Sequence, residues 1–279
     1  MTEAEAAAAA VEADADAAEP LVRRAVERGV ATLTLDSPHN RNALSARLVR
    51  ELYAGLAAAG DDPEVRTVVL THTGGTFCAG ADLTEASGAA APDGADGPTG
   101  AAADLARLLR TVVAFPKPVV ARVTGHVRAG GTGLVAACDI AVAGPGATFA
   151  FTEARIGVAP AVISMPLLPR LAPRAAGRYF LTGERFGAAE AARIGLVTEA
   201  VEAAEDVDRV LAPVLDGLRR GSPQGLAESK RLATAEVLRV FDRDTGSLAE
   251  LSARLFASDE AREGVSAFLE RRDPRWVHH

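Results

Sequence analysis

Apolar and polar positions alternate along the chain in a way that predicts strands and helices in turn. Within 45–59, Leu48, Leu52 and Leu56 recur every four residues, which is typical of an amphipathic helix. Continuous apolar runs that predict buried strands lie at 30–35, 67–71 and 119–123. Because strands and helices follow one another, the pattern indicates an α/β fold.

The second half of the chain has the pattern of helices. Apolar residues at helical spacing occupy 188–194 and 226–241. Near the end, Ser258 can cap a further helix, with acidic residues favourable in its first turn. The apolar residues that share one face of this last helix are Val265, Phe268 and Leu269. We therefore expect helices to dominate from residue 166 onward.

Two segments lack this periodicity. Residues 1–20 are almost entirely alanine and acid, which predicts a disordered tail rather than a signal peptide. The glycine, alanine and aspartate stretch at 87–100 predicts a mobile loop. We divide the chain into the tail at 1–20, a core at 21–205 and a helical region at 206–279.

Glycine-rich turns follow predicted strands at two places. One lies at 73–83, after the strand at 67–71, and the other lies at 129–134. Glycine lets a ligand oxygen approach the main chain, and the N–H groups that open a helix are unpaired. Either turn alone is most simply a chain reversal. Together they can each give one N–H to the same carbonyl oxygen, which predicts an oxyanion hole.

The second turn also has features of a dinucleotide-binding site. Gly131, Gly133 and Ala136 have the spacing of that fingerprint. Glu153 lies about twenty residues on, where a ribose-binding acid is expected. However, only about two helical turns fit before the apolar run at 140–143, which is shorter than a crossover helix needs. We therefore reject the dinucleotide site.

Seven motifs occur in a fixed order along most of the chain. They are Asp36-Ser37-Pro38-x-Asn40-Arg41-Asn42-Ala43-Leu44, Phe77-Cys78-Ala79-Gly80-Ala81-Asp82-Leu83, Lys117-Pro118-Val119-Val120-Ala121, Gly130-Gly131-x-Gly133 with Cys138-Asp139-Ile140, Thr152-Glu153, Leu181-Thr182-Gly183-Glu184 and Ser258-Asp259-Glu260-Ala261-Arg262-Glu263-Gly264-Val265. Together they resemble the enoyl-CoA hydratase/isomerase (crotonase) superfamily. The nearest motifs are those of bacterial enoyl-CoA and methylglutaconyl-CoA hydratases.

The resemblance implies a crotonase-like spiral of ββα units, with C-terminal helices that join subunits into a homotrimer or a dimer of trimers. It implies an acyl-CoA thioester as substrate, so that coenzyme A is part of the substrate and no separate cofactor is expected. The catalytic groups it implies are the backbone N–H groups of Ala81 and Gly130 and the carboxyl of Glu153. Substrate contacts are implied for Arg41, Ala43, Ala79, Ala81, Asp82, Leu83, Gly130 and Gly133.

The chain departs from the hydratase pattern at Gly133. The best-known hydratases have one glutamate at this position and a second one later, which hold a water between them. Here only the later one, Glu153, remains. One positioned acid or base is typically worth about 10²–10⁴ in rate, so Glu153 alone is sufficient for proton transfer.

Three functions therefore stay open. The leading one is hydration of a 2-enoyl-CoA, including a branched or acidic one, with Glu153 as base and acid. The second is isomerisation of a 3-enoyl-CoA to a 2-enoyl-CoA through the same residue, and the third is acyl-CoA binding without turnover. The retained glutamate favours an enzyme. Arg128 is a candidate partner for a substrate carboxylate, although a surface role is the simpler interpretation.

Other polar residues in the motifs are expected to be structural. Glu184 has the position of a helix-start or ion-pair residue. Asp82 and Asp139 lie beside strand-to-helix turns, where carboxylates commonly accept backbone N–H bonds. Cys78 and Cys138 are expected to be buried, reduced thiols.

Composition limits the remaining classes. With 279 residues, 48% of them hydrophobic, the chain is long enough for one large domain and a helical appendage. A net charge of −7 is unfavourable for binding nucleic acid or an anionic membrane. The five histidines are scattered and no cysteine pair has zinc spacing, so no metal is expected. Without an apolar run of roughly 20 residues, we expect a soluble, cytoplasmic protein.

Overall fold

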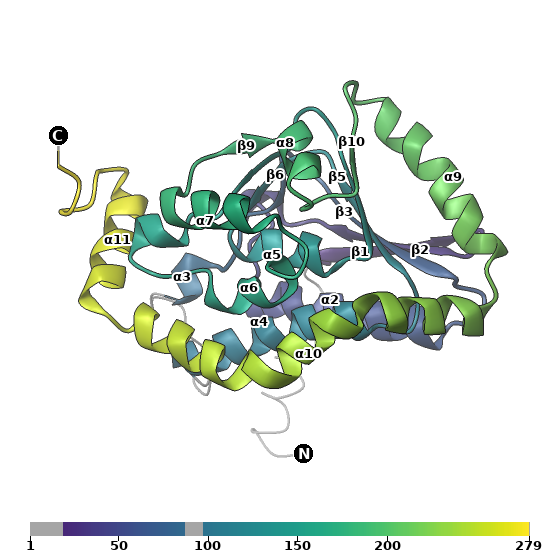
Figure 1. The fold of residues 1–279 in the computed structure, drawn as a ribbon, viewed down its shortest axis with the longest axis horizontal. Helices are drawn as coiled ribbons and strands as arrows, with labels where there is room; N and C mark the ends of the chain where they lie inside the picture. The colour runs from purple at the N-terminus through teal and green to yellow at the C-terminus, as the bar shows by residue number, and fades with distance from the viewer. Residues whose placement is uncertain (1–18, 87–96, 279) are drawn as a thin grey trace, which may run out of the picture.

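The computed structural model describes residues 19–86 and 97–278 (Figure 1). Its strands are β1 (Val22–Glu27), β2 (Val30–Leu35), β3 (Thr67–His72), β4 (Thr76–Cys78), β5 (Val119–Val123), β6 (His126–Arg128), β7 (Ile140–Ala143), β8 (Thr148–Ala150), β9 (Phe186–Gly187) and β10 (Glu199–Ala200). Its α-helices are α2 (Ala46–Asp61), α3 (Leu83–Ala86), α4 (Gly97–Ala114), α5 (Gly130–Ala137), α6 (Ala161–Leu167), α7 (Pro173–Thr182), α8 (Ala188–Arg193), α9 (Asp206–Arg220), α10 (Pro223–Phe256) and α11 (Asp259–Glu270). Two short 3-10 helices are η1 (Pro38–Asn40) and η2 (Glu153–Ile156).

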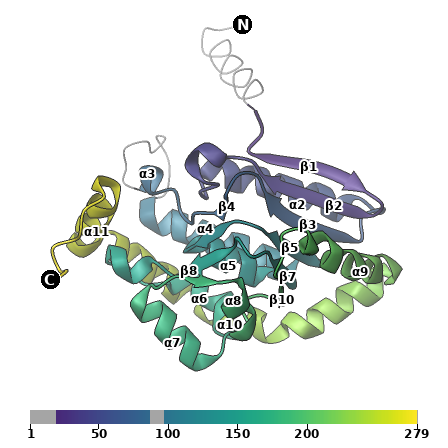
Figure 2. The same ribbon diagram turned by 90° about the horizontal axis from the view of Figure 1, so that it is seen from above.

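Strands from successive parts of the chain enter two sheets in turn. The larger sheet has the order β1-β2-β3-β5-β7-β10 and the smaller one the order β4-β6-β8-β9. Thus β3, β5 and β7 belong to the first sheet, and the strand that follows each of them belongs to the second (Figure 2). A helix comes after each such pair of strands. This repetition is the expected spiral of ββα units.

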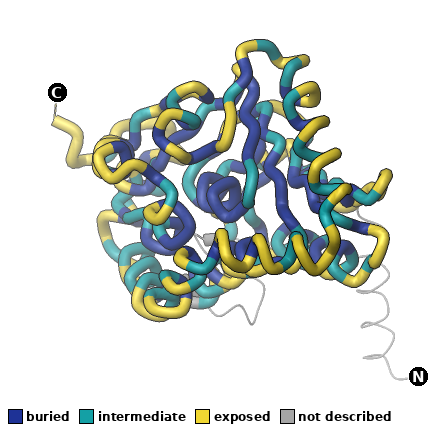
Figure 3. The backbone as a smooth tube through the Cα atoms, turned by 45° about the vertical axis from the view of Figure 1, so that its right-hand side comes forward, coloured by how far each residue is buried: buried dark blue, intermediate teal, exposed yellow. Residues whose placement is uncertain are grey.

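The helix α5 lies inside the molecule. All eight of its residues are buried, and three of them are glycines, which allow close packing. In Figure 3 the interior is dark blue, and exposed residues lie outside it, on the surrounding helices, the turns and the edge strand β1. Because this helix is fully enclosed, its two ends are fixed relative to the surrounding strands.

The C-terminal helices cover three parts of this core. On the large sheet, α9 buries Val207 and Leu211 against a valine cluster that includes Val142. The long helix α10 packs along α4 and α6, and α11 packs against η2 (Figure 1). The helical region thus reaches back to a turn that follows the small sheet.

Several elements agree closely with the sequence pattern. The predicted strands at 30–35 and 119–123 coincide with β2 and β5. The side chain of Ser45 caps α2 by accepting the N–H of Leu48. Leu48, Leu52 and Leu56 are at most 1% exposed, as an amphipathic helix packed on a sheet requires.

Four expectations need correction or lie, in whole or in part, outside the described residues. The helix α4 begins at Gly97, so the last part of the predicted loop at 87–100 is helical. The helix α10 has 34 residues, far more than the predicted 226–241. The apolar side chains Phe268 and Leu269 of α11 are 56% and 54% exposed, because the buried face consists of small residues. Residues 1–18 of the predicted tail and 87–96 of the predicted loop are not among those described.

Candidate active site

Three parallel strands of the small sheet end side by side. The strand β6 pairs with β4 on one side and with β8 on the other, and both pairings are parallel. The carboxyl ends of parallel strands meet at one edge of a sheet, where ligands commonly bind. The segments that follow these strands are 79–81 after β4, 129–130 after β6 and 152–153 after β8.

The backbones that carry the two predicted amides lie against each other. A Cβ placed on Gly80 would lie 3.1 Å from the nitrogen of Gly130, and one placed on Gly130 would lie 3.7 Å from the nitrogen of Ala81. The N–H of Gly130 opens α5 and so has no acceptor within that helix. Among the described residues, the N–H of Ala81 has no acceptor either. Two unpaired donors are therefore adjacent.

The residue before Gly130 has an unusual backbone conformation. Ala129 has φ 45° and ψ −120°, a region that favours glycine. Several hydrogen bonds hold it there: its N–H donates to the carbonyl of Ala150, and its own carbonyl accepts from the N–H and hydroxyl of Thr132. This local strain sets the direction of the Gly130 amide.

A short extended segment forms one wall beside Ala81. Leu44 makes a parallel bridge with Ala81, and its N–H donates to the carbonyl of Gly80 at 2.8 Å. The N–H of Ala79 donates to the carbonyl of Arg41, whose φ is 59°. Ala43 is buried, whereas Arg41 is exposed. The predicted contacts 41–43 and 79–81 therefore lie together, with a cationic side chain at the surface.

Glu153 follows β8, which ends at Ala150, and is the first residue of η2. It is 8% exposed, and among the described residues its Oε2 is buried without a hydrogen-bond partner. Burial disfavours the carboxylate and raises the pKa of Glu153 from its ordinary 4.5 to about 7. Near neutral pH this group is therefore present in both protonation states.

The position of the missing glutamate is filled by hydrocarbon. A Cβ placed on Gly133 would lie 2.7 Å from Cγ2 of Ile163 and 3.1 Å from Cδ1 of Leu109. These side chains come from α6 and α4. No side chain fits at residue 133 without displacing them, so the sequence departure at Gly133 is matched by its surroundings.

The other acids of the motifs have structural partners. Asp82 accepts the N–H groups of Thr84 and Glu85 at the start of α3. Leu83 begins the same helix. Glu184 pairs with Arg178, as expected. These carboxylates stabilise turns and helix ends.

Asp139 lies at the opposite end of α5. It accepts the N–H of Val119 at 2.7 Å and pairs with Lys230 at 2.8 Å. A cavity of about 420 Å³ opens here, lined in part by Asp139 and Arg170. An eight-residue helix is about 12 Å long, so this cavity is well separated from Gly130.

Arg128 is committed to the small sheet. Its guanidinium donates to the carbonyls of Val127 and Thr148 and to the hydroxyl of Thr148. The side chain is half-buried, so the guanidinium is neither a free surface group nor free to contact a substrate carboxylate. Burial lowers the pKa of Arg128, and the positive charge of the nearby Arg185 lowers it further, to about 10.

The thiols and possible metal ligands add little to the site. Cys78 and Cys138 are free and buried, as predicted, and burial raises the pKa of each to about 12. Within the described part of the chain, no three His, Cys, Asp or Glu side chains are grouped to hold a metal ion. No helix among the same residues is long and apolar enough to cross a membrane.

The apolar wall of the site was not predicted from the sequence. Ile163 and Leu109 lie against Gly133 from helices that are separate in the chain. No local sequence pattern predicts that contact. The only signal was Gly133 itself, because a glycine inside a buried helix often marks close approach by a neighbour.

Known proteins resemble this chain over most of its length. The family model of the enoyl-CoA hydratase/isomerase family matches residues 25–279. An enoyl-CoA hydratase from Mycobacterium avium has a crystal structure that is 56% identical, with a TM-score of 0.84, covering 93% of this chain and 100% of that one.

Curated relatives agree with this result. A protein named "probable enoyl-CoA hydratase" from Rhodobacter capsulatus is 36% identical over 92% of this chain and 97% of its own length. The carnitinyl-CoA dehydratase of Escherichia coli is 33% identical over 88% of this chain and 93% of its own. The fold, the ordered motifs and these similarities lead to one conclusion: the chain is an enzyme that belongs to the enoyl-CoA hydratase/isomerase family.

Proposed function

We propose that this protein hydrates a 2-enoyl-CoA with one glutamate, Glu153, and an oxyanion hole made by the N–H groups of Ala81 and Gly130. The observation that carries the proposal is a pair of adjacent, unpaired amides together with a buried carboxyl on the turn that follows β8. Among the described residues, Oε2 of this carboxyl has no hydrogen-bond partner. The relatives named enoyl-CoA hydratase support the same reaction class.

The two amides would act on the thioester carbonyl. When the oxygen of water adds to the β-carbon, or when the α-carbon loses a proton, negative charge develops on the thioester oxygen. Donors fixed in advance stabilise that charge, and one such donor is typically worth about 3–4 kcal/mol. The side chains at 81 and 130 need to be small because the backbones touch there.

Glu153 would take one proton and return it. As a carboxylate it accepts a proton from water, which adds to the β-carbon, and as an acid it then protonates the α-carbon. A pKa of about 7 suits both steps at neutral pH. Below pH 7 the base form is lost, so kcat/KM should fall about tenfold per pH unit.

Isomerisation of a 3-enoyl-CoA is the second candidate, and one observation favours it. Ile163 and Leu109 occupy the space beside Gly133, so a second carboxylate does not hold the water there. Moving a proton between two carbons of the same substrate requires only one carboxyl. The same residues therefore support either reaction.

Coenzyme A would extend past Arg41. This arginine is exposed beside the wall that contacts Ala79, and its cation suits a phosphate. Since Arg128 is occupied by β8, an acidic acyl group has no assigned partner, and we favour a neutral enoyl chain.

The test compares Glu153→Gln with the unmodified enzyme on crotonyl-CoA and on a 3-enoyl-CoA. Loss of conjugated absorbance reports hydration, and its gain reports isomerisation. We expect turnover to fall by about 10²–10⁴ while the affinity for acyl-CoA stays within about twofold. Glu228→Gln is the matched control, because Glu228 lies in an exposed ion pair with Arg231 on α10. If Glu153→Gln retains a tenth or more of the activity, the proposed role is wrong.

A further inference from the structure

The helix α11 contacts its neighbours through small residues. Its buried positions are Ala261, Gly264 and Ala267, which recur every three residues, while Phe268 is mostly exposed. Small residues on one face allow the backbone of a helix to approach another backbone closely. Here that face is turned toward η2.

Two glycines make the contact between α11 and η2. A Cβ placed on Gly264 would lie 2.5 Å from the carbonyl carbon of Ile156, and one placed on Gly157 would lie 2.6 Å from the carbonyl carbon of Glu260. Gly157 also has φ +78°, which ends η2 in a conformation that favours glycine. Neither contact leaves room for a methyl group.

The turn that α11 touches is the one that carries Glu153. The residues of η2 are Glu153–Ile156, so the carboxyl and the Gly264 contact lie on one short helix. The N–H of Val158 donates back to the carbonyl of Glu153 at 3.1 Å. A shift at Ile156 is therefore passed directly to Glu153.

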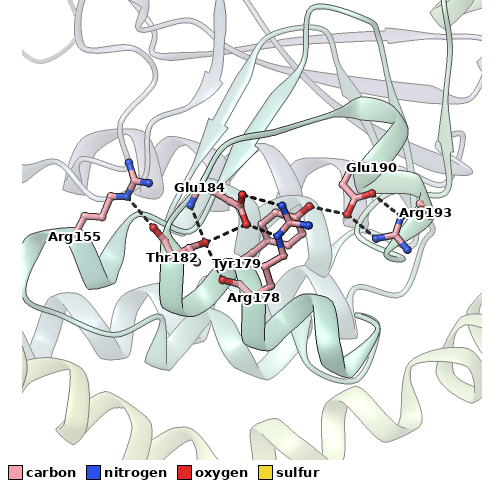
Figure 4. A network of polar contacts seen from close by, with 7 residues as sticks. All are labelled: Arg155, Arg178, Tyr179, Thr182, Glu184, Glu190 and Arg193. Carbon is pink, nitrogen blue, oxygen red and sulfur yellow. Dashed lines mark hydrogen bonds and ion pairs between the residues drawn. The ribbon is translucent and has the colours of Figure 1, made fainter.

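The other side of η2 is held by α7. Nε of Arg155 donates to the carbonyl of Thr182 at 3.0 Å, as Figure 4 shows. Thr182 and Arg178 both contact Glu184 at the end of this helix. The turn is thus fixed between an ion-paired surface network and the backbone of α11.

We propose that α11 is the positioning element for Glu153, and that Gly264 and Gly157 are positioning residues whose backbone contacts fix the carboxyl in the site. The inference rests on the proposed role of Glu153. Displacing α11 by the width of a methyl group should turn η2 and let water reach the carboxyl. The expected result is slower chemistry with nearly unchanged acyl-CoA affinity.

The decisive variant is Gly264→Ala, with Gly246→Ala as its matched control. Gly246 lies on α10, and a Cβ placed on it would have nothing within 4 Å, so alanine fits there. We expect Gly264→Ala to lower kcat by roughly 10²-fold with KM within about threefold, because small misplacement of a catalytic group is costly. Gly246→Ala should leave both constants unchanged.

A pH profile separates positioning from a general loss of stability. Hydration of the carboxyl would lower the pKa of Glu153 toward its ordinary value, so the acidic limb of kcat/KM should move below pH 7 in Gly264→Ala. Hydrogen exchange of the amides at 154–158 should become faster. A merely destabilised protein would lose active molecules without moving this limb.

Ser258→Ala is a second variant if Gly264→Ala does not fold. It removes only the cap of α11, whose side chain accepts the N–H of Ala261, and it introduces no clash. We expect a smaller change in the same direction. Unchanged kcat and an unchanged acidic limb, in a variant whose exchange at 154–158 has become faster, would overturn the positioning role. Retained activity in Glu153→Gln would instead overturn the proposed function itself.

Discussion

Two carboxyls near the ends of α5 differ in their polar partners: the half-buried Asp139 follows the C-terminal end of the helix, and the buried Glu153 follows β8, which pairs with the strand leading into the helix. At the C-terminal end, Asp139 pairs with Lys230, which also donates to the carbonyls of Val112 and Lys117. Near the N-terminal end, Oε2 of Glu153 has no partner among the described residues, and the N–H of Gly130 is free of the helix.

This difference separates a stabilising region from a reactive one. Burying a charge is unfavourable unless a partner compensates it. Burial raises the pKa of Asp139, and the cations Lys230 and Arg170 offset part of that shift. At Glu153 no cation offsets the burial, which raises its pKa to about 7. Strained and unsatisfied groups of this kind are concentrated at functional sites.

The largest expected effect on stability comes from removing the ion pair between Lys230 and Asp139. Lys230→Ala leaves the half-buried Asp139 without its ion-pair partner, with Arg170 as the remaining nearby cation, and should reduce the free energy of unfolding by about 3–5 kcal/mol. Urea titration followed by circular dichroism measures this loss. Arg231→Ala, on the exposed side of the same helix, is the control and should change stability by less than about 0.5 kcal/mol. Equal midpoints for the two variants would show that the pair is not stabilising.

Removing the carboxyl of Glu153 should have the opposite effect and increase the free energy of unfolding. The folded pKa of Glu153 is raised to about 7, so its folded form retains the proton over a range where the unfolded chain has lost it. The contribution of the Glu153 carboxyl to stability is complete below its unfolded pKa and is lost as the pH rises through 7. Glu153→Gln should therefore raise the free energy of unfolding by up to about 3 kcal/mol at pH 8 and by almost nothing at pH 4.5.

Thermal melting at both pH values measures this gain. Glu184→Gln serves as the reference, because Arg178 lowers the pKa of Glu184 and its removal should not stabilise the protein. A Glu153→Gln variant that is less stable than the unmodified enzyme at pH 8 would contradict the contrast between the two ends of α5.

A smaller effect sharpens the comparison inside the helix. Gly133→Ala places a methyl group against Ile163 and Leu109 and should destabilise the protein by about 1–3 kcal/mol. Gly177→Ala, on α7 with open space, should be neutral or gain up to about 1 kcal/mol from helix propensity. If both variants melt alike, the hydrocarbon wall beside residue 133 is looser than its distances indicate.

The long buried elements were predictable because their apolar runs are continuous. The strands β2 and β5 and the helix α2 agree with the pattern almost residue for residue. The strands β4 and β6 have only three residues each, too few for a periodic signal. They are specified by pairing with neighbours, which a local pattern does not contain.

The helical region shows the same limit. The sequence of α10 is periodic only over part of its length, and packing on α4 and α6 extends it. On α11 the larger side chains indicated the wrong buried face, because the true contact is made by glycine and alanine. Long-range contacts such as Gly264 with Ile156 depend on topology rather than local sequence.

The candidate site was predicted through its motifs and not from physical pattern alone. The structure brings Ala81 and Gly130 together and buries Glu153 on the turn that follows β8. The roles of these residues remain predictions until the variants are measured. Ile163 was not predicted, since its contact with Gly133 joins two separate helices.

The strained backbone of Ala129 places the stability of the fold in conflict with the orientation of the Gly130 N–H. Its conformation costs of order 1–3 kcal/mol for a residue with a side chain, and glycine would relieve much of that cost. Selection for thermal stability would therefore favour the substitution Ala129→Gly. The relaxed peptide would then sample more directions, and the neighbouring amide would point at its target for a smaller fraction of the time.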